Sequence, residues 1–145
     1  MITEDLLNGV ATSISSGTFS LPFSSVDVKL APVVPSNNRP LTAVVGFDSV
    51  DHIKTSRCKW QNTQVIRVII SDFVGVGDIE AQALARIGLV AEVVEHLKTD
   101  AYSIVSGGDK FVLSEVRTDP HYSYEALIEE SFFLSAIFLT YTGYK

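Results

Sequence analysis

Apolar residues occupy most positions of residues 132–141, close to the end of the sequence. Side chains of a β-strand alternate between its two faces, so a strand in this segment would be apolar on both. One face would carry Phe132, Leu134, Ala136 and Phe138, and the other would carry Phe133, Ile137, Leu139 and Tyr141. A strand of an antiparallel sheet needs only one apolar face. We therefore expect a helix of the same chain, or another copy of the protein, to cover the second face.

The first predicted element is a short helix that begins at Thr3 and ends at Gly17. Thr3 suits the N-cap position, the carboxylates of Glu4 and Asp5 complement the helix dipole, and glycine commonly follows a helix C-terminus. Apolar residues recur at helical spacing along one side of this segment: Leu6, Leu7, Val10, Ala11 and Ile14. A single stripe of this kind predicts one buried face.

Alternation of apolar and polar residues predicts three strands, at residues 26–30, 41–47 and 64–73. The prolines within residues 32–40 are typical of a turn or an extended loop between the first two strands. Residues 48–62 are polar and irregular. They fit either a long loop or a hairpin arm that leaves the body of the protein.

A long helix is predicted from Ile79 to about Lys98, with Asp78 as its N-cap. Its apolar residues form two neighbouring stripes. The first stripe, which we expect to face the core, contains Leu84, Ile87, Ala91, Val94 and Leu97, and the second contains Ala85, Leu89 and Val93. An apolar sector of this width exceeds what packing on one sheet face requires.

The surplus of apolar residues on this helix and on the terminal strand indicates a candidate subunit interface. Its residues are Leu89, Val93, Phe133, Ile137 and Leu139. The alternative is that the helix and the strand cover each other within one subunit. A wide apolar helix packed on a buried strand would have the same pattern.

A last hairpin is expected, in which residues 111–118 pair with the terminal strand. Gly107 and Gly108 are the expected tight turn before it, and a short helix is predicted at residues 124–128. The order of elements predicts an α+β fold, with an antiparallel or mixed sheet of four to five strands. The N-terminal helix and the long helix would pack against this sheet, and residues 1–145 would form a single domain.

Composition narrows the function classes. The 145 residues are 46% hydrophobic and 19% charged, which argues against global disorder, and the net charge of −6 differs from the basic surface of a nucleic-acid-binding protein. We expect no signal peptide and no membrane partner, because no apolar run approaches the length of about 20 residues that spans a bilayer. One cysteine, Cys58, allows no disulfide within the chain.

A cluster of basic residues is the one local exception to the acidic balance. It comprises His52, Lys54, Arg57 and Lys59, with Trp60 beside it. These five residues are a candidate loop for contacting a neighbouring subunit or another structural protein. The simpler interpretation is a solvated surface loop.

No pattern of catalytic, cofactor-binding or metal-binding residues emerges, so we do not expect an enzyme. Gly75 and Gly77 lie between a strand and a helix, but Glu80 stands where the dinucleotide fingerprint requires a third glycine. None of the three histidines has a metal-ligand partner at helical or hairpin spacing. A different class of function stays open, in which a small cytoplasmic protein or enzyme binds a phosphate ligand at the turn before the long helix.

The layout of the chain resembles the tail terminator (tail completion) proteins of long-tailed bacteriophages, the lambda-type group. The resemblance covers most of the chain. It rests on the helix opening Ile2-Thr3-Glu4-Asp5-Leu6-Leu7, the strand Thr42-Ala43-Val44-Val45-Gly46-Phe47, the polar excursion to Lys59-Trp60-Gln61, the strand Val65-Ile66-Arg67-Val68-Ile69-Ile70, the long helix from Asp78, the segment Val116-Arg117-Thr118-Asp119, and the terminal strand at residues 134–141.

The resemblance implies a structural virion protein made in the host cytoplasm, without catalysis or cofactor. Six copies would form a ring that caps the tail tube, stops its polymerisation and offers a surface for head-tail joining. The partners would be other copies of the chain, the tail tube protein and a head-completion or neck protein. DNA would pass through the lumen without specific binding. A neck or head-completion protein of the same connector region is the nearest alternative.

Overall fold

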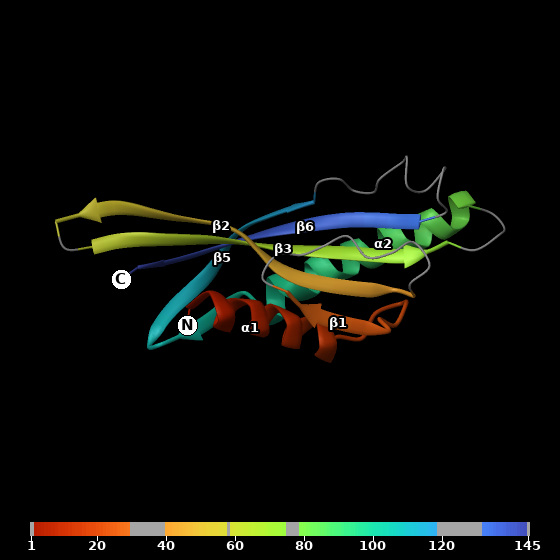
Figure 1. The fold of residues 1–145 in the computed structure, drawn as a ribbon, viewed down its shortest axis with the longest axis horizontal. Coiled ribbons are helices and arrows are strands. Elements are labelled where there is room, and N and C mark those ends of the chain that lie inside the picture. The colour runs from red at the N-terminus through yellow and green to blue at the C-terminus, as the bar shows by residue number, and fades with distance from the viewer. Residues whose placement is uncertain (1, 30–39, 58, 75–78, 119–131, 145) are drawn as a thin grey trace.

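A computed structural model describes residues 2–29, 40–57, 59–74, 79–118 and 132–144. These residues form two helices and one mixed, curled sheet (Figure 1). The elements are α1 (Ile2–Ser16), β1 (Ser25–Val28), β2 (Thr42–Ser56), β3 (Lys59–Phe73), α2 (Ile79–Asp100), β4 (Ser103–Ser106), β5 (Asp109–Thr118) and β6 (Phe132–Tyr144). The predicted α+β class is confirmed, but the sheet has six strands where four to five were expected.

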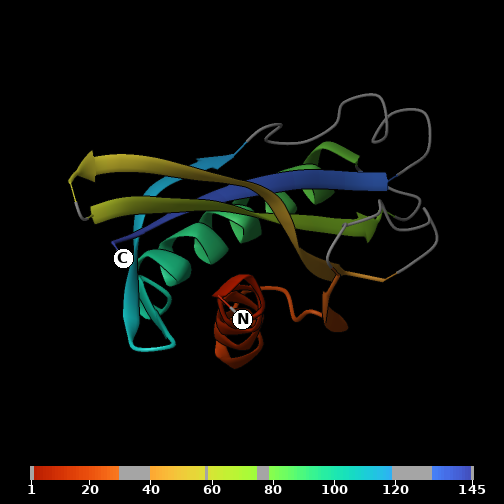
Figure 2. The same ribbon diagram turned by 60° about the vertical axis from the view of Figure 1, so that its left-hand side comes forward.

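The strands lie in the order β1-β2-β3-β6-β5-β4. β1 pairs with β2 in parallel, and every other neighbouring pair is antiparallel. The terminal strand therefore lies at the centre of the sheet, between β3 and β5. Both helices lie on the same side of the long strands, with α2 running behind them and α1 beside it (Figures 1 and 2).

The extra strand is β4, which precedes the predicted glycine turn. Gly107 and Gly108 have φ angles of +59° and +86°, and they join β4 to β5 as a tight hairpin. Positive φ at both central residues is the requirement of a type I′ turn. The turn prediction is confirmed, whereas four residues are too few for an alternating pattern to reveal the strand before it.

The core lies between the helices and one face of the sheet. The stripe on α1 is buried as predicted, and so is the face of β6 that carries Phe133, Ile137, Leu139 and Tyr141. The opposite face of β6 carries Leu134, Ala136 and Phe138, which are half-buried. Helices of the same chain thus cover one of the two apolar faces of the terminal strand.

The orientation of α2 differs from the prediction. Its buried residues are Ala83, Leu89, Val90, Val93 and Leu97. Leu84, predicted to face the core, is 68% exposed, and Ala91 is exposed as well. With two apolar stripes side by side, the sequence does not determine which one meets the sheet. The structure turns Leu89 and Val93 of the second stripe inward together with Leu97 of the first. It leaves Ala85 exposed and Ile87 and Val94 half-buried on the flank of the helix.

Candidate interaction site

Strands β2 and β3 extend beyond the body of the protein as a hairpin arm, at the left of Figure 1. We define the arm as residues 48–56 of β2 with residues 59–65 of β3. Pairing continues to the tip, with Ile53 opposite Gln61 and Lys54 opposite Trp60. Strand β6 accompanies β3 only as far as the pair of Gln61 with Tyr144. Of the two interpretations of the polar segment, the structure shows the hairpin arm.

The arm begins at an irregularity in β2. The strand register shifts between Phe47 and Ser49, which is the signature of a β-bulge at Asp48. A bulge bends its strand and increases the local twist. From Asp48 to Ser56, every residue of β2 is exposed. The bulge therefore marks where β2 leaves the packed sheet.

One side of the arm carries two exposed apolar side chains, Val50 and Trp60, with the polar His52 and Lys54 on the same face. Val50 lies opposite Gln64, and Lys54 lies opposite Trp60, so these residues share the face of the sheet that the helices cover further along. Val50 is 40% exposed and Trp60 is 48% exposed. The Lys54 ammonium lies 5.8 Å from the centroid of the Trp60 ring, a cation–π contact that holds both side chains at the tip.

The base of the arm is attached to α1. Gln64, on the same face as Trp60, is buried, and its Oε1 accepts a hydrogen bond of 2.9 Å from the Thr3 hydroxyl. Asn62 is also buried, and its Oδ1 has no hydrogen-bond partner among the described residues. The structure thus holds the arm at its base and leaves its outer part in solvent.

The predicted contact residues come together at the tip of this arm. His52 and Lys54 are exposed on β2, Arg57 is exposed in the turn, and Trp60 lies on β3. Lys59 opens β3, and its side chain lies outside the described residues, as does Cys58. The sequence left a long loop and a hairpin arm open for this segment. The structure places His52, Lys54 and Trp60 on paired strands with a defined register, and Arg57 in the turn between them.

The predicted subunit interface lies in the core of the single chain. Leu89, Val93, Phe133, Ile137 and Leu139 each have 0% exposure. The helix and the strand cover each other within one subunit, which was the alternative interpretation. These five side chains have no surface left for a neighbouring subunit, so we do not retain them as interface residues.

Rotation of α2 creates a different apolar surface beside β5, which we call the α2–β5 groove. A hollow of about 250 Å³ is lined by Ile87, Val90, Ala91, Val94, Glu95 and Thr118. A second hollow of about 190 Å³ follows between the same helix and strand, lined by Lys98, Tyr102, Leu113, Ser114, Glu115 and Val116. The stripe that the sequence assigned to the core thus forms part of a surface groove.

The edge of β5 beside this groove is unpaired in the described part of the chain. Strand β4 covers β5 only from Asp109 to Val112, and the Leu113 amide donates to the Tyr102 carbonyl at 2.8 Å. From residue 114 to residue 118, no described strand lies on the side of β5 away from β6. Ser114, Glu115 and Arg117 are exposed. The groove therefore adjoins a short free sheet edge.

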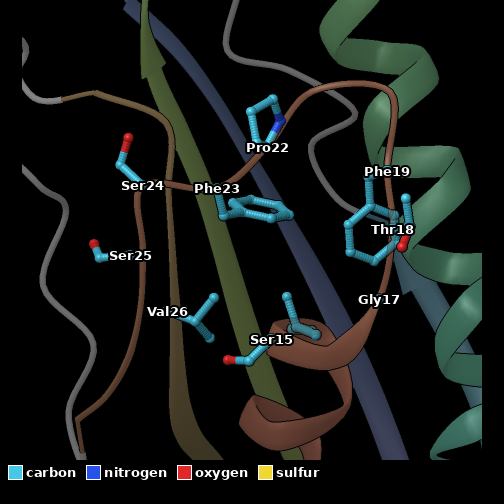
Figure 3. Close-up of a pocket in the computed structure, with 10 residues that line it drawn as sticks. Ser15, Gly17, Thr18, Phe19, Pro22, Phe23, Ser24, Ser25 and Val26 are labelled. Atoms are coloured by element: carbon cyan, nitrogen blue, oxygen red, sulfur yellow. The ribbon is translucent and has the colours of Figure 1, made fainter.

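A hollow of about 440 Å³ lies at the C-terminal end of α1 (Figure 3). Figure 3 shows Phe19, Phe23 and Val26 as its apolar walls, with the hydroxyls of Ser15 and Ser24 at its margin. The Phe19 ring packs edge-on against the rings of Phe23 and His96. These uncharged walls suit an apolar or neutral group.

Two polar contacts fix α2 in its orientation. At its start, Arg86 Nε and Nη2 both lie 2.9 Å from Asp72 Oδ2 on β3. Burial raises the pKa of Asp72 above its ordinary value of 3.8, and the nearby Arg86 guanidinium offsets part of that rise. After its end, the buried Tyr141 hydroxyl donates to the Ala101 carbonyl at 2.6 Å. These contacts hold α2 in a fixed relation to β3 and β6.

Other predicted features lie outside the described residues: the turn at Gly75, Gly77 and Asp78, and the short helix at residues 124–128. Among the described residues, no group of His, Cys, Asp and Glu side chains is arranged to hold a metal ion. Within the same residues, no helix is both long and apolar enough to cross a membrane.

Comparison with known proteins identifies the fold alone. No protein-family model matches the sequence, and no curated protein matches it. A solved structure, whose name states no function, resembles this one with a TM-score of 0.56 over 98% of this chain and 92% of that chain. The two sequences are 14% identical.

Proposed function

We propose that this chain is a structural virion protein of the tail terminator type, which assembles into a ring on the end of a tail tube. The ring would stop tube polymerisation and provide the surface for head-tail joining. The observation that carries the proposal is the exposed arm. It is a paired extension with exposed apolar side chains and a basic tip, and every residue of β2 in it is exposed.

The stability of the arm argues for a partner. Strand β6 pairs with β3 as far as Gln61, so only the tip of the arm, around Lys54 and Trp60, is a two-stranded ribbon, which is marginally stable in water without a further strand or a packed surface. The outer part of the arm exposes Val50, Ile53 and Trp60, each at 40% or more. A surface of this kind is expected to be covered when the protein works, and covering by other copies yields an assembly.

Ring formation follows from the separation of the candidate surfaces. The arm and the α2–β5 groove are different patches of one chain, so a contact between them joins the head of one copy to the tail of the next. Such heterologous contacts produce closed rings when the rotation between copies closes. The net charge of −6 suits a lumen through which DNA slides, because an acidic wall repels the phosphate backbone.

The assembly part of the proposal is tested by native mass across a concentration series, with negative-stain images of each species. We expect a closed ring with a central hole. A compact dimer or tetramer without a hole would contradict the ring.

The tail-specific part is tested with tail tubes from the phage or prophage whose genome encodes the chain. Labelled protein should bind tube ends and halt further addition of tube subunits. Binding to the head connector with no effect on tube length would favour the neck or head-completion alternative. The phosphate-ligand alternative rests on residues 75–78, which lie outside the described residues.

A further inference from the structure

Among the described residues, two edges of the sheet have no neighbouring strand, and they lie on opposite sides of it. Beyond Val45, whose carbonyl accepts from the Lys29 amide, no described strand lies beside β2 on the side away from β3. The other free edge is β5 from residue 114 to residue 118. Strands β3 and β6 separate the two edges within one chain. One copy therefore cannot pair its own edges, but two copies can pair one edge from each.

Strand direction makes this pairing geometrically simple. Within one copy, β2, β3, β6 and β5 alternate in direction, because each neighbouring pair is antiparallel. A second copy placed beside β5 in the same orientation brings its own β2 antiparallel to that β5. The helices of both copies then lie on the same side of one continuous sheet. No subunit has to be inverted, as a cyclic ring requires.

We propose that the arm of one copy adds as an antiparallel strand to the β5 edge of the next copy and lays Val50, Lys54 and Trp60 over the α2–β5 groove. These three residues lie on the helix side of the arm, which is the side that would meet α2. Backbone hydrogen bonds along an exposed edge give affinity in such strand additions, and side-chain pockets give specificity. The inference rests on the proposed ring and identifies its contact.

Side chains on the two surfaces are complementary. The arm offers Val50 and Trp60, and the groove offers Ile87, Ala91 and Val94. Residues 52–60 contain three of the eleven Lys and Arg residues of the chain and none of its seventeen Asp and Glu residues. The groove is lined by the exposed acids Glu95 and Glu115 and by the exposed base Lys98, which pairs with Glu95 at 3.1 Å, so apolar side chains and not net charge carry the match.

Two variants, each lacking one of the surfaces, provide the test. The arm variant is Val50→Ser with Trp60→Ser, and the groove variant is Ala91→Arg, which places a bulky cation in the hollow. Each variant keeps the surface that the other has lost. We expect each alone to be monomeric by native mass, because neither can propagate a head-to-tail contact. Mixed in equal amounts, they should form a 1:1 dimer and nothing larger.

Matched controls separate loss of contact from loss of fold. Ile53→Ser changes the opposite side of the arm, and Ala85→Arg adds the same cation to an exposed position of α2 away from the groove. Both should assemble as the wild type does. At a concentration too low for assembly, thermal melting of all four variants should lie close to that of the wild type, because every substituted side chain is substantially exposed.

The outcomes distinguish the inference from the proposed function. A wild type that stays monomeric at the highest concentration overturns the ring and the contact together. If the wild type forms rings and either the arm variant or the groove variant also forms rings, the proposed contact is wrong and the proposed ring is retained. Two monomeric variants that stay monomeric when mixed also overturn it, because their remaining surfaces would then not be complementary.

Discussion

At the scale of residues, the difference between neighbouring leucines on α2 decides how the helix is used. Leu89 is fully buried between the helix and the sheet, whereas Leu84 is 68% exposed. Both belong to apolar stripes of similar strength, so the sequence alone does not show which of the two leucines is buried. Because Leu89 is buried, its packing stabilises the fold, whereas Leu84 lies on the surface.

Leu89→Ala should lower the free energy of unfolding by about 2–5 kcal/mol, the usual cost of truncating a buried leucine. Leu84→Ala should change it by about 0.5 kcal/mol or less, as exposed substitutions do. Urea denaturation of both variants measures the two values. Similar losses for both would show that α2 is rotated differently from the orientation described above.

Asp72 offers a test of electrostatics at the same scale. Its pKa is raised by burial, so the folded state binds the proton more tightly than the unfolded state. The stability that this carboxyl contributes is therefore complete below its ordinary pKa of 3.8 and falls as the pH rises through the raised value. Asp72→Asn removes this titration. The stability of the wild type relative to the variant should decline with rising pH, measured by denaturant unfolding from pH 3 upward; a relative increase would contradict the direction of the shift.

At the scale of elements, the strength and number of hydrophobic patterns determined what could be predicted. α1 has one apolar stripe and was assigned correctly, while α2 has two and was assigned with the wrong face inward. Of the five candidate interface residues, Leu89 and Val93 followed from that same ambiguity, and the other three followed from the two apolar faces of β6. The arm stayed open between loop and hairpin, because exposed strands lose the alternation that burial imposes. Its pairing depends on register with β3, which no single segment encodes.

The β4–β5 hairpin provides an element-scale prediction. Gly107 and Gly108 both have positive φ, and a Cβ added at either would meet no atom within 4 Å. Backbone conformation alone then decides the effect of substitution. Gly107→Asn should be nearly neutral, since asparagine tolerates this conformation, whereas Gly108→Val should cost about 1–2 kcal/mol. Thermal melting of the two variants checks the contrast, and equal melting temperatures would argue against the turn type.

At the scale of the whole molecule, the sheet is both the core and the proposed means of assembly. β3 contributes Ile66, Val68 and Ile70 to the buried core and then continues to Trp60 at the arm tip. Toward the other edge of the sheet, on the face that the helices cover, the flank of α2 forms the α2–β5 groove with β5. The proposed contact therefore uses surfaces that no single predicted element displays, because they arise from the packing of β2, β5 and α2 together.

The sole tryptophan of the chain reports on this contact directly. Trp60 is 48% exposed in the single chain, and the proposed strand addition would bury it against α2 of the next copy. Its fluorescence emission should move to shorter wavelength, and acrylamide should quench it less, as concentration rises through assembly. Emission that stays constant while the native mass grows to that of a ring would place Trp60 outside the contact.

The continuity of β3 from core to tip has a consequence for which copies could enter the proposed assembly. The arm cannot hold its register unless the central strands are already folded, because its base is fixed by Gln64 and by β6. A misfolded copy would therefore present no ordered arm to its neighbour. Incorporation into the assembly would proofread each subunit, and defective copies would be rejected without any separate checking factor.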